Sequence, residues 1–481
     1  MKKSKVMKKG YWDRWNEDIQ AEIDENIEKH RKADGVFKLK GLKAGTPVKV
    51  QQLKHAFIFG AHIFNFDQLG SDERNEKYKA LYGDIFNSAT VPFYWRTFEP
   101  EEGSPRFEAE FRDSPQFWNT VKEPKMEPHW RRPPTDPVID FCEKKGIRIH
   151  GHPLFWGSYK WFTPDWLYQK MPKEWRDRLP DESIFESASP AAAILEEYSA
   201  EEIFKLMPEF AVELQTSMTK RISEIAFRYG KRVQSWDVCN ESATDFQRGN
   251  MLPDMPICKS HYGPMPGDYT FRAFKLAESL LPEKALLNIN DYNLSEAYLE
   301  QIRDLKKRGC KIDIVGAQMH LFNPQACQDI ADGKSDVQSP QNVLETMKRL
   351  SRADRPIHLS EITITAPGGD ARGEEIQAVI ARNLYRLWFS TERMMGITWW
   401  NVVDDCGAPG EPSVSGLFHR DMTPKASFHA LQELIQNEWM TKCTVKAAQN
   451  GTLKFRGFRG SYLLSWTDEK GKKMEEKVHL A

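Results

Sequence analysis

A short apolar run followed by a longer amphipathic stretch repeats through most of this 481-residue chain. The alternation is typical of βαβ units, in which helices connect parallel strands. Eight of the apolar runs have the length of a strand, and eight parallel strands close a (β/α)8 TIM barrel, an α/β fold. The expected strands are Ala56–Gly60, Ser88–Phe93, Ile147–His150, Ser235–Val238, Ala285–Ile289, Asp313–Gln318, Ile357–Ser360 and Gly396–Trp400.

Amphipathic segments with helical periodicity separate these runs. The expected helices include Ser199–Tyr229, Tyr269–Leu280, Ala297–Arg308, Ser339–Arg352 and Gly373–Thr391.

Alternating segments at both chain ends predict a small β appendage outside the barrel. At the amino-terminal end, a helix-prone stretch from Asp18 to Lys32 precedes strand-like segments between Val36 and Gly60. We therefore expect an N-terminal helix and strands in residues 1–52, the catalytic barrel in 53–437, and carboxy-terminal strands in 438–481 that pack with the N-terminal segment. The expected carboxy-terminal strands are Cys443–Ala447, Thr452–Phe458 and Ser461–Trp466.

Two stretches are too long for plain loops, at about 108–133 and 167–191. Both follow the carboxyl side of a strand region and are rich in Pro, Trp and charge. We expect them to wall a substrate cleft.

The composition excludes several classes of partner. The formal net charge is -1, so we expect no nucleic-acid partner, because neutralising phosphates needs an excess of base. No window reaches the roughly 18 uncharged apolar residues of a membrane helix, so we expect no membrane partner. Seven cysteines without a CxxC pair predict core thiols and no metal site. We expect a monomer.

The amino terminus is basic but runs into Tyr11 and Trp12 rather than into an apolar stretch, so we expect no signal peptide in this chain. The protein would then be cytoplasmic, or secreted or periplasmic if a leader has been removed.

Polar residues follow the expected strands where each of them ends. The carboxyl ends of barrel strands converge on one face, where catalytic residues lie. Two carboxylates at this face suit cleavage of a glycosidic bond, because one protonates the leaving oxygen and the other attacks the anomeric carbon or activates water. The set is His150 and His152, Asn240 and Glu241, Asn290 and Asp291, Gln318 and His320, Glu361, and Trp399 and Trp400.

These residues and their neighbours resemble glycoside hydrolase family 10, the family of endo-β-1,4-xylanases. The resemblance covers roughly residues 53–437 in seven ordered matches. They are Gly151-His152-Pro-Leu-Phe-Trp156, Trp236-Asp-Val-Cys-Asn240-Glu241-Ser, Asn288-Ile-Asn-Asp291-Tyr-Asn, Gly316-Ala-Gln318-Met-His320-Leu, Leu359-Ser-Glu361-Ile-Thr-Ile, Ile397-Thr-Trp-Trp400-Asn and Gly416-Leu-Phe-His-Arg-Asp421-Met-Thr-Pro424-Lys425.

The resemblance implies a retaining hydrolase of a β-linked, xylan-like polysaccharide or oligosaccharide, with Glu241 as general acid/base and Glu361 as nucleophile. Asn240 would bind the 2-hydroxyl of the sugar being cleaved, and His320 would orient Glu361. The same resemblance places His152, Trp156, Gln318 and Trp400 around the substrate. No metal or organic cofactor is expected, because the two carboxylates supply the proton transfer and the nucleophile.

Three departures from the family pattern suggest a changed substrate. The segment Thr90-Val-Pro-Phe-Tyr-Trp95 replaces one that carries an Asn and a Lys, so Val91, Phe93 and Tyr94 are expected to rebuild the neighbouring sugar subsite. Gly157 replaces a second His and is expected to leave space. Asp405-Cys406-Gly407-Ala408-Pro409 stands where a second Trp is usual. We therefore expect weak activity on linear xylan and a preference for a decorated glycan. A roof over this region is expected from Phe117, Trp118, His129 and Trp130.

Three alternatives remain open at this point. The first is a hydrolase of a different β-glycan, the second is a glycan-binding barrel that has lost turnover, and the third is a metal-dependent aldolase or isomerase on the same fold. The last requires a Schiff-base Lys or a carboxylate and His metal cluster at the strand ends, and no Lys stands there.

Overall fold

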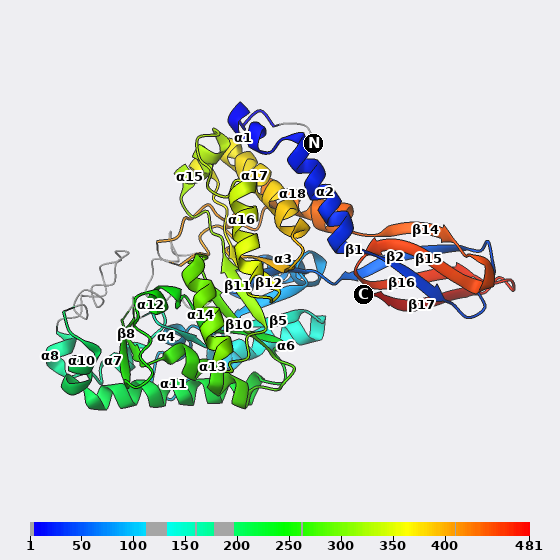
Figure 1. Cartoon of the computed structure of the whole chain (residues 1–481). Coiled ribbons are helices and arrows are strands. Elements are labelled where there is room, and N and C mark those ends of the chain that lie inside the picture. The colour runs from blue at the N-terminus through cyan, green and yellow to red at the C-terminus, as the bar shows by residue number, and fades with distance from the viewer. Residues whose placement is uncertain (1–3, 112–131, 159–160, 178–196, 261–262, 409) are drawn as a thin grey trace.

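Eight parallel strands close into a barrel in the computed structural model, which describes residues 4–111, 132–158, 161–177, 197–260, 263–408 and 410–481 (Figure 1). Each strand pairs with the next, and the last pairs with the first, so the predicted (β/α)8 fold is confirmed. In order, the strands are β3 (Ile58–His62), β4 (Ser88–Pro92), β5 (Arg148–His152), β7 (Ser235–Asn240), β10 (Leu286–Asp291), β11 (Ile314–Gln318), β12 (Ile357–Ile362) and β13 (Met394–Trp399).

Several strands continue beyond their expected ends. Strand β7 was expected to stop at Val238 but continues to Asn240, and β12 was expected to stop at Ser360 but continues to Ile362. Parallel pairing with the neighbouring strands supports these extra residues, with Asn290 beside Asn240 and Gln318 beside Glu361. The polar residues predicted to follow the strands therefore include several that belong to the strands themselves.

Helices surround the barrel, and residues in the sequence explain where one of them breaks. The expected helix Ser199–Tyr229 is two helices, α10 (Ala200–Leu206) and α11 (Pro208–Tyr229). Pro208 has no N–H to donate to the preceding turn, so α10 ends there and α11 begins with the proline. The other main helices are α3 (Asp72–Asp84), α6 (Thr135–Lys145), α13 (Tyr269–Leu280), α14 (Glu296–Lys307), α16 (Pro340–Ser351), α17 (Ala371–Ser390) and α18 (Ala426–Gln432).

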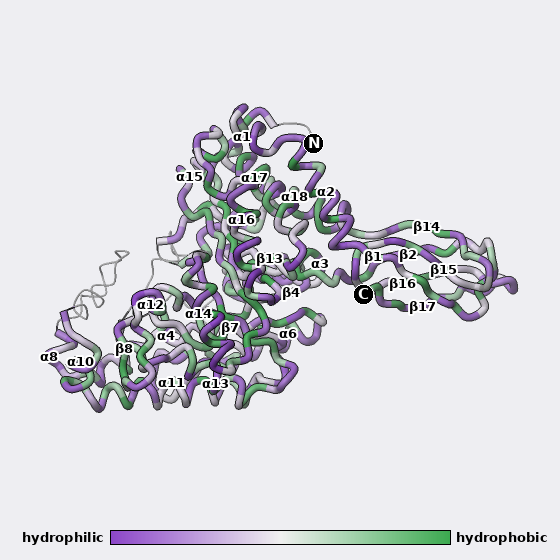
Figure 2. Tube along the Cα trace, viewed as in Figure 1, coloured by the Kyte–Doolittle hydropathy of each residue, from purple (hydrophilic) through white to green (hydrophobic). Residues whose placement is uncertain are grey.

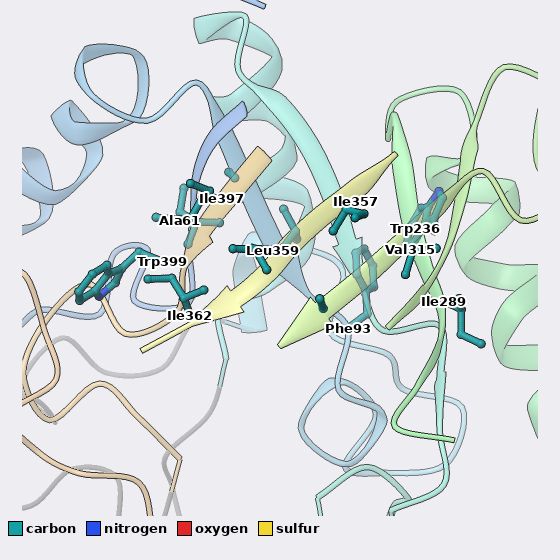
Figure 3. Packing of buried hydrophobic residues seen from close by; sticks show 14 of the residues in the cluster. Ala61, Phe93, Trp236, Ile289, Val315, Ile357, Leu359, Ile362, Ile397 and Trp399 are labelled. Carbon is teal, nitrogen blue, oxygen red and sulfur yellow. The ribbon is translucent and has the colours of Figure 1, made fainter. Parts of the chain in front are cut away.

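The hydrophobic core lies between the strands and these helices. Figure 2 shows hydrophobic stretches gathered in the interior and hydrophilic ones along the outer surface. Buried side chains from neighbouring strands, among them Ile289, Val315 and Leu359, belong to one cluster with Trp236 (Figure 3). A Cβ on Gly151 would lie 2.2 Å from the Trp236 ring, so only glycine fits at this position.

Strands from both chain ends form a separate β unit that projects from the barrel (Figure 1). Strand β2 (Pro47–His55) lies between β14 (Lys442–Lys446) and β16 (Gly460–Thr467), and β17 (Lys473–Leu480) completes this four-stranded sheet. Strand β1 (Lys32–Lys38) pairs with β15 (Thr452–Phe458). The prediction that both ends build the appendage is confirmed, but β17 was not expected.

The N-terminal helix α2 (Glu17–Arg31) joins this unit to the barrel. Arg31 donates to the backbone carbonyls of Phe389 and Thr391 at the end of α17, and Asp24 pairs with Arg386. Within the described ranges no helix is long and apolar enough to cross a bilayer. Most of the two long insertions lies outside the described residues, including the expected roof of Phe117, Trp118, His129 and Trp130.

Candidate active site

Glu241 and Glu361 meet at the carboxyl end of the barrel, on either side of one amide group. The Nε2 atom of Gln318 lies 3.0 Å from Oε1 of Glu241 and 3.2 Å from Oε1 of Glu361. These two oxygens are therefore at most about 6 Å apart, so both carboxylates can reach one glycosidic bond.

Glu361 is buried and surrounded by hydrogen-bond donors. Asn290 donates from Nδ2 to Oε1 over 2.7 Å, and His320 places Nε2 3.3 Å from Oε2. The Nε2 atom of His152 lies 3.7 Å from Oε1. The Nδ1 atom of His320 is 3.0 Å from Oγ1 of Thr363, which fixes the ring. These contacts hold both carboxylate oxygens in place.

Asn240 belongs to the same network. Its Oδ1 accepts hydrogen bonds from Asn290 over 2.8 Å and from Gln318 over 3.2 Å. The orientation of the amide next to Glu241 is therefore set by side chains from two other strands.

A histidine and aspartate chain lies beneath the carboxylates inside the barrel. Oδ2 of Asp237 lies 2.8 Å from Nε2 of His150 and 2.7 Å from Nδ1 of His152. Burial alone would raise the pKa of Asp237, but the two imidazoles outweigh it and hold this pKa well below its usual value. The chain fixes the ring of His152 so that its other nitrogen faces Glu361.

Aromatic rings border the carboxylates. Trp400 is 5% exposed, and its ring centre lies 5.4 Å from that of His152 and 6.0 Å from that of His320. Tyr94 lies 5.5 Å from His152, and Trp156 lies 6.2 Å from Tyr94. All eight predicted site residues are thus brought to one end of the barrel: Glu241, Glu361, His152, Trp156, Asn240, Gln318, His320 and Trp400.

Glu241 adopts a backbone conformation that few side chains tolerate. Its φ is +52°, in the left-handed region. The turn that follows is held from β10, because Glu241 N donates to the Asn290 carbonyl and Ala243 N donates to Oδ2 of Asp291, both over 2.8 Å. Strained backbone of this kind concentrates at functional sites, where surrounding contacts compensate its cost.

Asp291, which holds this turn, is itself fully buried. Burial raises the pKa of Asp291 to about 7, although backbone N–H groups from Ala243 and Asn293 act in the opposite direction. Its carboxyl group is therefore partly protonated near neutral pH.

Sequence reasoning placed Asn290 at a strand end but gave it no role, and it missed Asp237 and Thr363. Asn290 reaches from β10 past β11 to β12, and the contacts of Asp237 lie inside the barrel. The sequence pointed to Asn290 only through its place among several polar residues at a strand end.

Two expectations about the neighbouring subsite were wrong. Val91 and Phe93 are fully buried, and Phe93 packs against Trp236 and Tyr229, so only Tyr94 of that segment reaches the site. Gly157 leaves no space, because a Cβ there would lie 2.7 Å from Oγ of Ser260.

Among the residues that the structure describes, no group of three or more His, Cys, Asp or Glu side chains could hold a metal ion. All seven cysteines are free, and every one except Cys443 is buried, as predicted for core thiols.

Comparison with known families decides the assignment. The model of glycosyl hydrolase family 10 matches residues 71–434, most of the barrel. The chain belongs to glycosyl hydrolase family 10.

Two relatives in family 10 are distant in sequence and much longer than this chain. Endo-1,4-beta-xylanase 2 of Arabidopsis thaliana is 21% identical over 456 residues, which cover 90% of this chain and 32% of that protein. Endo-1,4-beta-xylanase A of Caldicellulosiruptor sp. is 25% identical over 311 residues, which cover 62% of this chain and 38% of that protein. The matched regions thus span about a third of these relatives.

Solved family 10 structures share the barrel. Xylanase 10B from Thermotoga maritima superimposes with a TM-score of 0.52 at 18% identity, covering 80% of this chain and 96% of that one. A GH10 endoxylanase from a sugarcane soil metagenome gives the same TM-score at 21% identity, covering 79% of this chain and 97% of that one. At these identities the likeness shows the fold.

Proposed function

We propose that this protein is a retaining glycoside hydrolase that cleaves a β-linked, xylan-like glycan. The observation that carries the proposal is the approach of Glu241 and Glu361 to one Gln318 nitrogen, at 3.0 and 3.2 Å. Retaining glycosidases need their carboxyl groups about 5–5.5 Å apart, so that one attacks the anomeric carbon directly.

The two carboxylates act in two steps. In the first, Glu241 gives its proton to the glycosidic oxygen while Glu361 attacks the anomeric carbon, so the bond to the leaving sugar breaks and a glycosyl ester forms. In the second, Glu241 takes a proton from water, whose oxygen attacks the same carbon and releases Glu361. Both carboxylates end in their starting protonation states.

The residues around the two carboxylates bind the sugar and orient Glu361. The amides of Asn240 and Gln318 can bind sugar hydroxyls. His152 lies beside Oε1 of Glu361. His320 positions Glu361, while Trp400 and Trp156 offer faces for sugar rings.

We infer that the natural glycan is decorated with acidic groups. The guanidinium of Arg132 lies 4.5 Å from the Phe64 ring centre and 5.8 Å from that of Tyr94, which packs on His152. A cation this close to the site would attract a uronate side group. The two relatives described above are named endo-1,4-beta-xylanases, which supports a xylan backbone.

A hydrolysis screen with product sizing tests the proposal. We expect turnover of glucuronylated xylan to exceed that of linear xylan, and Glu361→Gln to abolish both. Arg132→Gln should reduce the preference for glucuronylated over linear xylan and leave the rate on linear xylan unchanged. If the wild type hydrolysed no β-glycan but still bound one, the protein would be a glycan-binding barrel and the proposal would fail.

A further inference from the structure

The four-stranded sheet of the β unit has one buried face and one open face. Val48 and Val50 of β2 and Leu464 of β16 point into a small core. Side chains in a strand alternate between the two faces, so the residues between these point outward. Lys49 and Gln51 of β2 are accordingly exposed.

Strand register arranges the outward residues in rows across the sheet. The first row runs Lys442, Gln51, Leu463, Lys477, and the second runs Thr444, Lys49, Ser465, Glu475. Beyond the second row, Lys446 lies opposite Pro47, and Lys473 lies opposite Thr467. We call this surface the lysine face.

The lysine face carries five lysines and one carboxylate. The lysines are exposed, and in the described part of the chain none of them forms an ion pair. Because the whole chain has a net charge of only -1, this positive charge is a local concentration. The lysines are Lys49, Lys442, Lys446, Lys473 and Lys477.

Apart from Leu463 and Pro47, the rest of the lysine face is polar. Serine, threonine and glutamine side chains stand between the lysines, and the aromatic residues Tyr462 and Trp466 point to the buried face. A neutral sugar chain is usually bound on exposed aromatic rings, which this face lacks. Its recognition chemistry is charge and hydrogen bonding.

Protection of sheet edges does not account for the whole pattern. Lysines on edge strands disfavour edge-to-edge pairing, and β14 and β17 are edges. Lys49 lies on β2, which has a partner on both sides. A central lysine adds nothing to edge protection but completes a continuous positive surface.

We propose that the lysine face binds an acidic polysaccharide, a glycan that carries carboxylates at intervals along its chain. Neighbouring strands are about 4.8 Å apart, and alternate residues along a strand are roughly 7 Å apart, so several lysines can pair with carboxylates of one extended chain. The choice of a glycan as the polyanion rests on the proposed function. The barrel and the β unit would then hold the same polymer at two places.

Binding is tested on the full chain with Glu361→Gln, which prevents degradation of the polymer. The probes are glucuronoxylan and the same polymer after its carboxyl groups have been reduced to alcohols, with affinity measured by titration calorimetry. We expect at least tenfold weaker binding to the reduced polymer. Binding to the acidic polymer should weaken steeply with salt, because ion pairing releases counterions.

A charge variant and a matched control locate the site. Lys49→Gln, Lys442→Gln and Lys477→Gln together should lower affinity for glucuronoxylan at least tenfold. The control, Lys284→Gln, Lys307→Gln and Lys348→Gln together, removes three exposed barrel lysines that form no ion pair in the described residues and should bind as the parent does. In the active enzyme, both triple variants should hydrolyse a small chromogenic glycoside at the wild-type rate, which shows that the barrel is folded.

Equal binding of the acidic and reduced polymers would overturn the inference, and so would equal loss of affinity in both triple variants. Displacement of glucuronoxylan by a lower concentration of duplex DNA would also overturn it in favour of a nucleic-acid surface. Binding without hydrolysis by the wild type would sink the proposed function alone, and hydrolysis without lysine-dependent binding would sink this inference alone.

Discussion

Asn290 on β10 donates a hydrogen bond of 2.7 Å to Oε1 of Glu361 on β12, past the intervening strand β11. The same Nδ2 atom lies 2.8 Å from Oδ1 of Asn240. One amide on β10 therefore connects Glu361 on β12, the proposed nucleophile, with Asn240 on β7, which precedes the proposed acid/base Glu241.

Asn290→Ala should reduce kcat by about 10- to 100-fold, because a small displacement of a reacting group is enough for such a loss. KM should change little, since Asn290 acts through Glu361 rather than on the glycan. Steady-state kinetics on an oligosaccharide measures both. Asn437→Ala, an exposed asparagine outside the site, is the control. A variant with full kcat would contradict the positioning role.

Glu241→Gln and Glu361→Gln should fail differently. If Glu361 is the nucleophile as proposed, Glu361→Gln should abolish turnover of every substrate. Loss of the acid should spare the first step for aryl glycosides with good leaving groups, because these need little protonation. Burst kinetics with activated and unactivated substrates separates the two. Equal losses on both substrate types in both variants would sink the role assignment.

The left-handed backbone at Glu241 predicts an inverted order of stability between two inactive variants. Glycine adopts φ near +52° without strain, whereas alanine pays about 1 kcal/mol there. Glu241→Gly should therefore be more stable than Glu241→Ala by about 1 kcal/mol. Urea denaturation of both proteins measures the difference, and an alanine variant at least as stable as the glycine variant would refute it.

Asp291 should make stability depend on pH in a defined window. Its pKa is raised from 3.8 to about 7 in the folded protein. Below pH 3.8 the group is protonated in both states, and between 3.8 and about 7 only the unfolded state ionises. Stability is therefore lost as pH rises through this window, by up to roughly 4 kcal/mol.

Asp291→Asn removes the titration but also one acceptor for a backbone N–H. We expect the variant to be less stable than the wild type near pH 4. This difference in stability should shrink steadily as the pH rises to about 7. Thermal unfolding at several pH values, read as the difference between the two proteins, checks this. Parallel curves would mean that Asp291 has an ordinary pKa.

The sequence predicted the barrel well because its strands are buried apolar runs separated by amphipathic helices, a pattern that few other folds share. Glu241 and Glu361 were predicted because strand ends in a barrel converge. Strand β17 was missed because half of the residues in Lys473–Leu480 are charged, and its pairing with β16 stabilises a strand that its composition does not favour.

Side-chain direction near strand ends was harder to predict. Val91 and Phe93 were expected at the substrate site, yet Val91 in β4 and Phe93 just after it both point towards the core. The role of Asn290 depends on the register between β11 and β12, which shifts between Gly316 and Gln318. Such a shift has no signature in one sequence.

The anomeric form of the first product tests the central claim most directly. We predict that proton NMR during early hydrolysis of a β-linked oligosaccharide shows the β-anomer first, followed by slow mutarotation, because two displacements at one carbon restore its configuration. Initial formation of the α-anomer would contradict the assignment of Glu361 as nucleophile and require a water molecule between the two carboxylates.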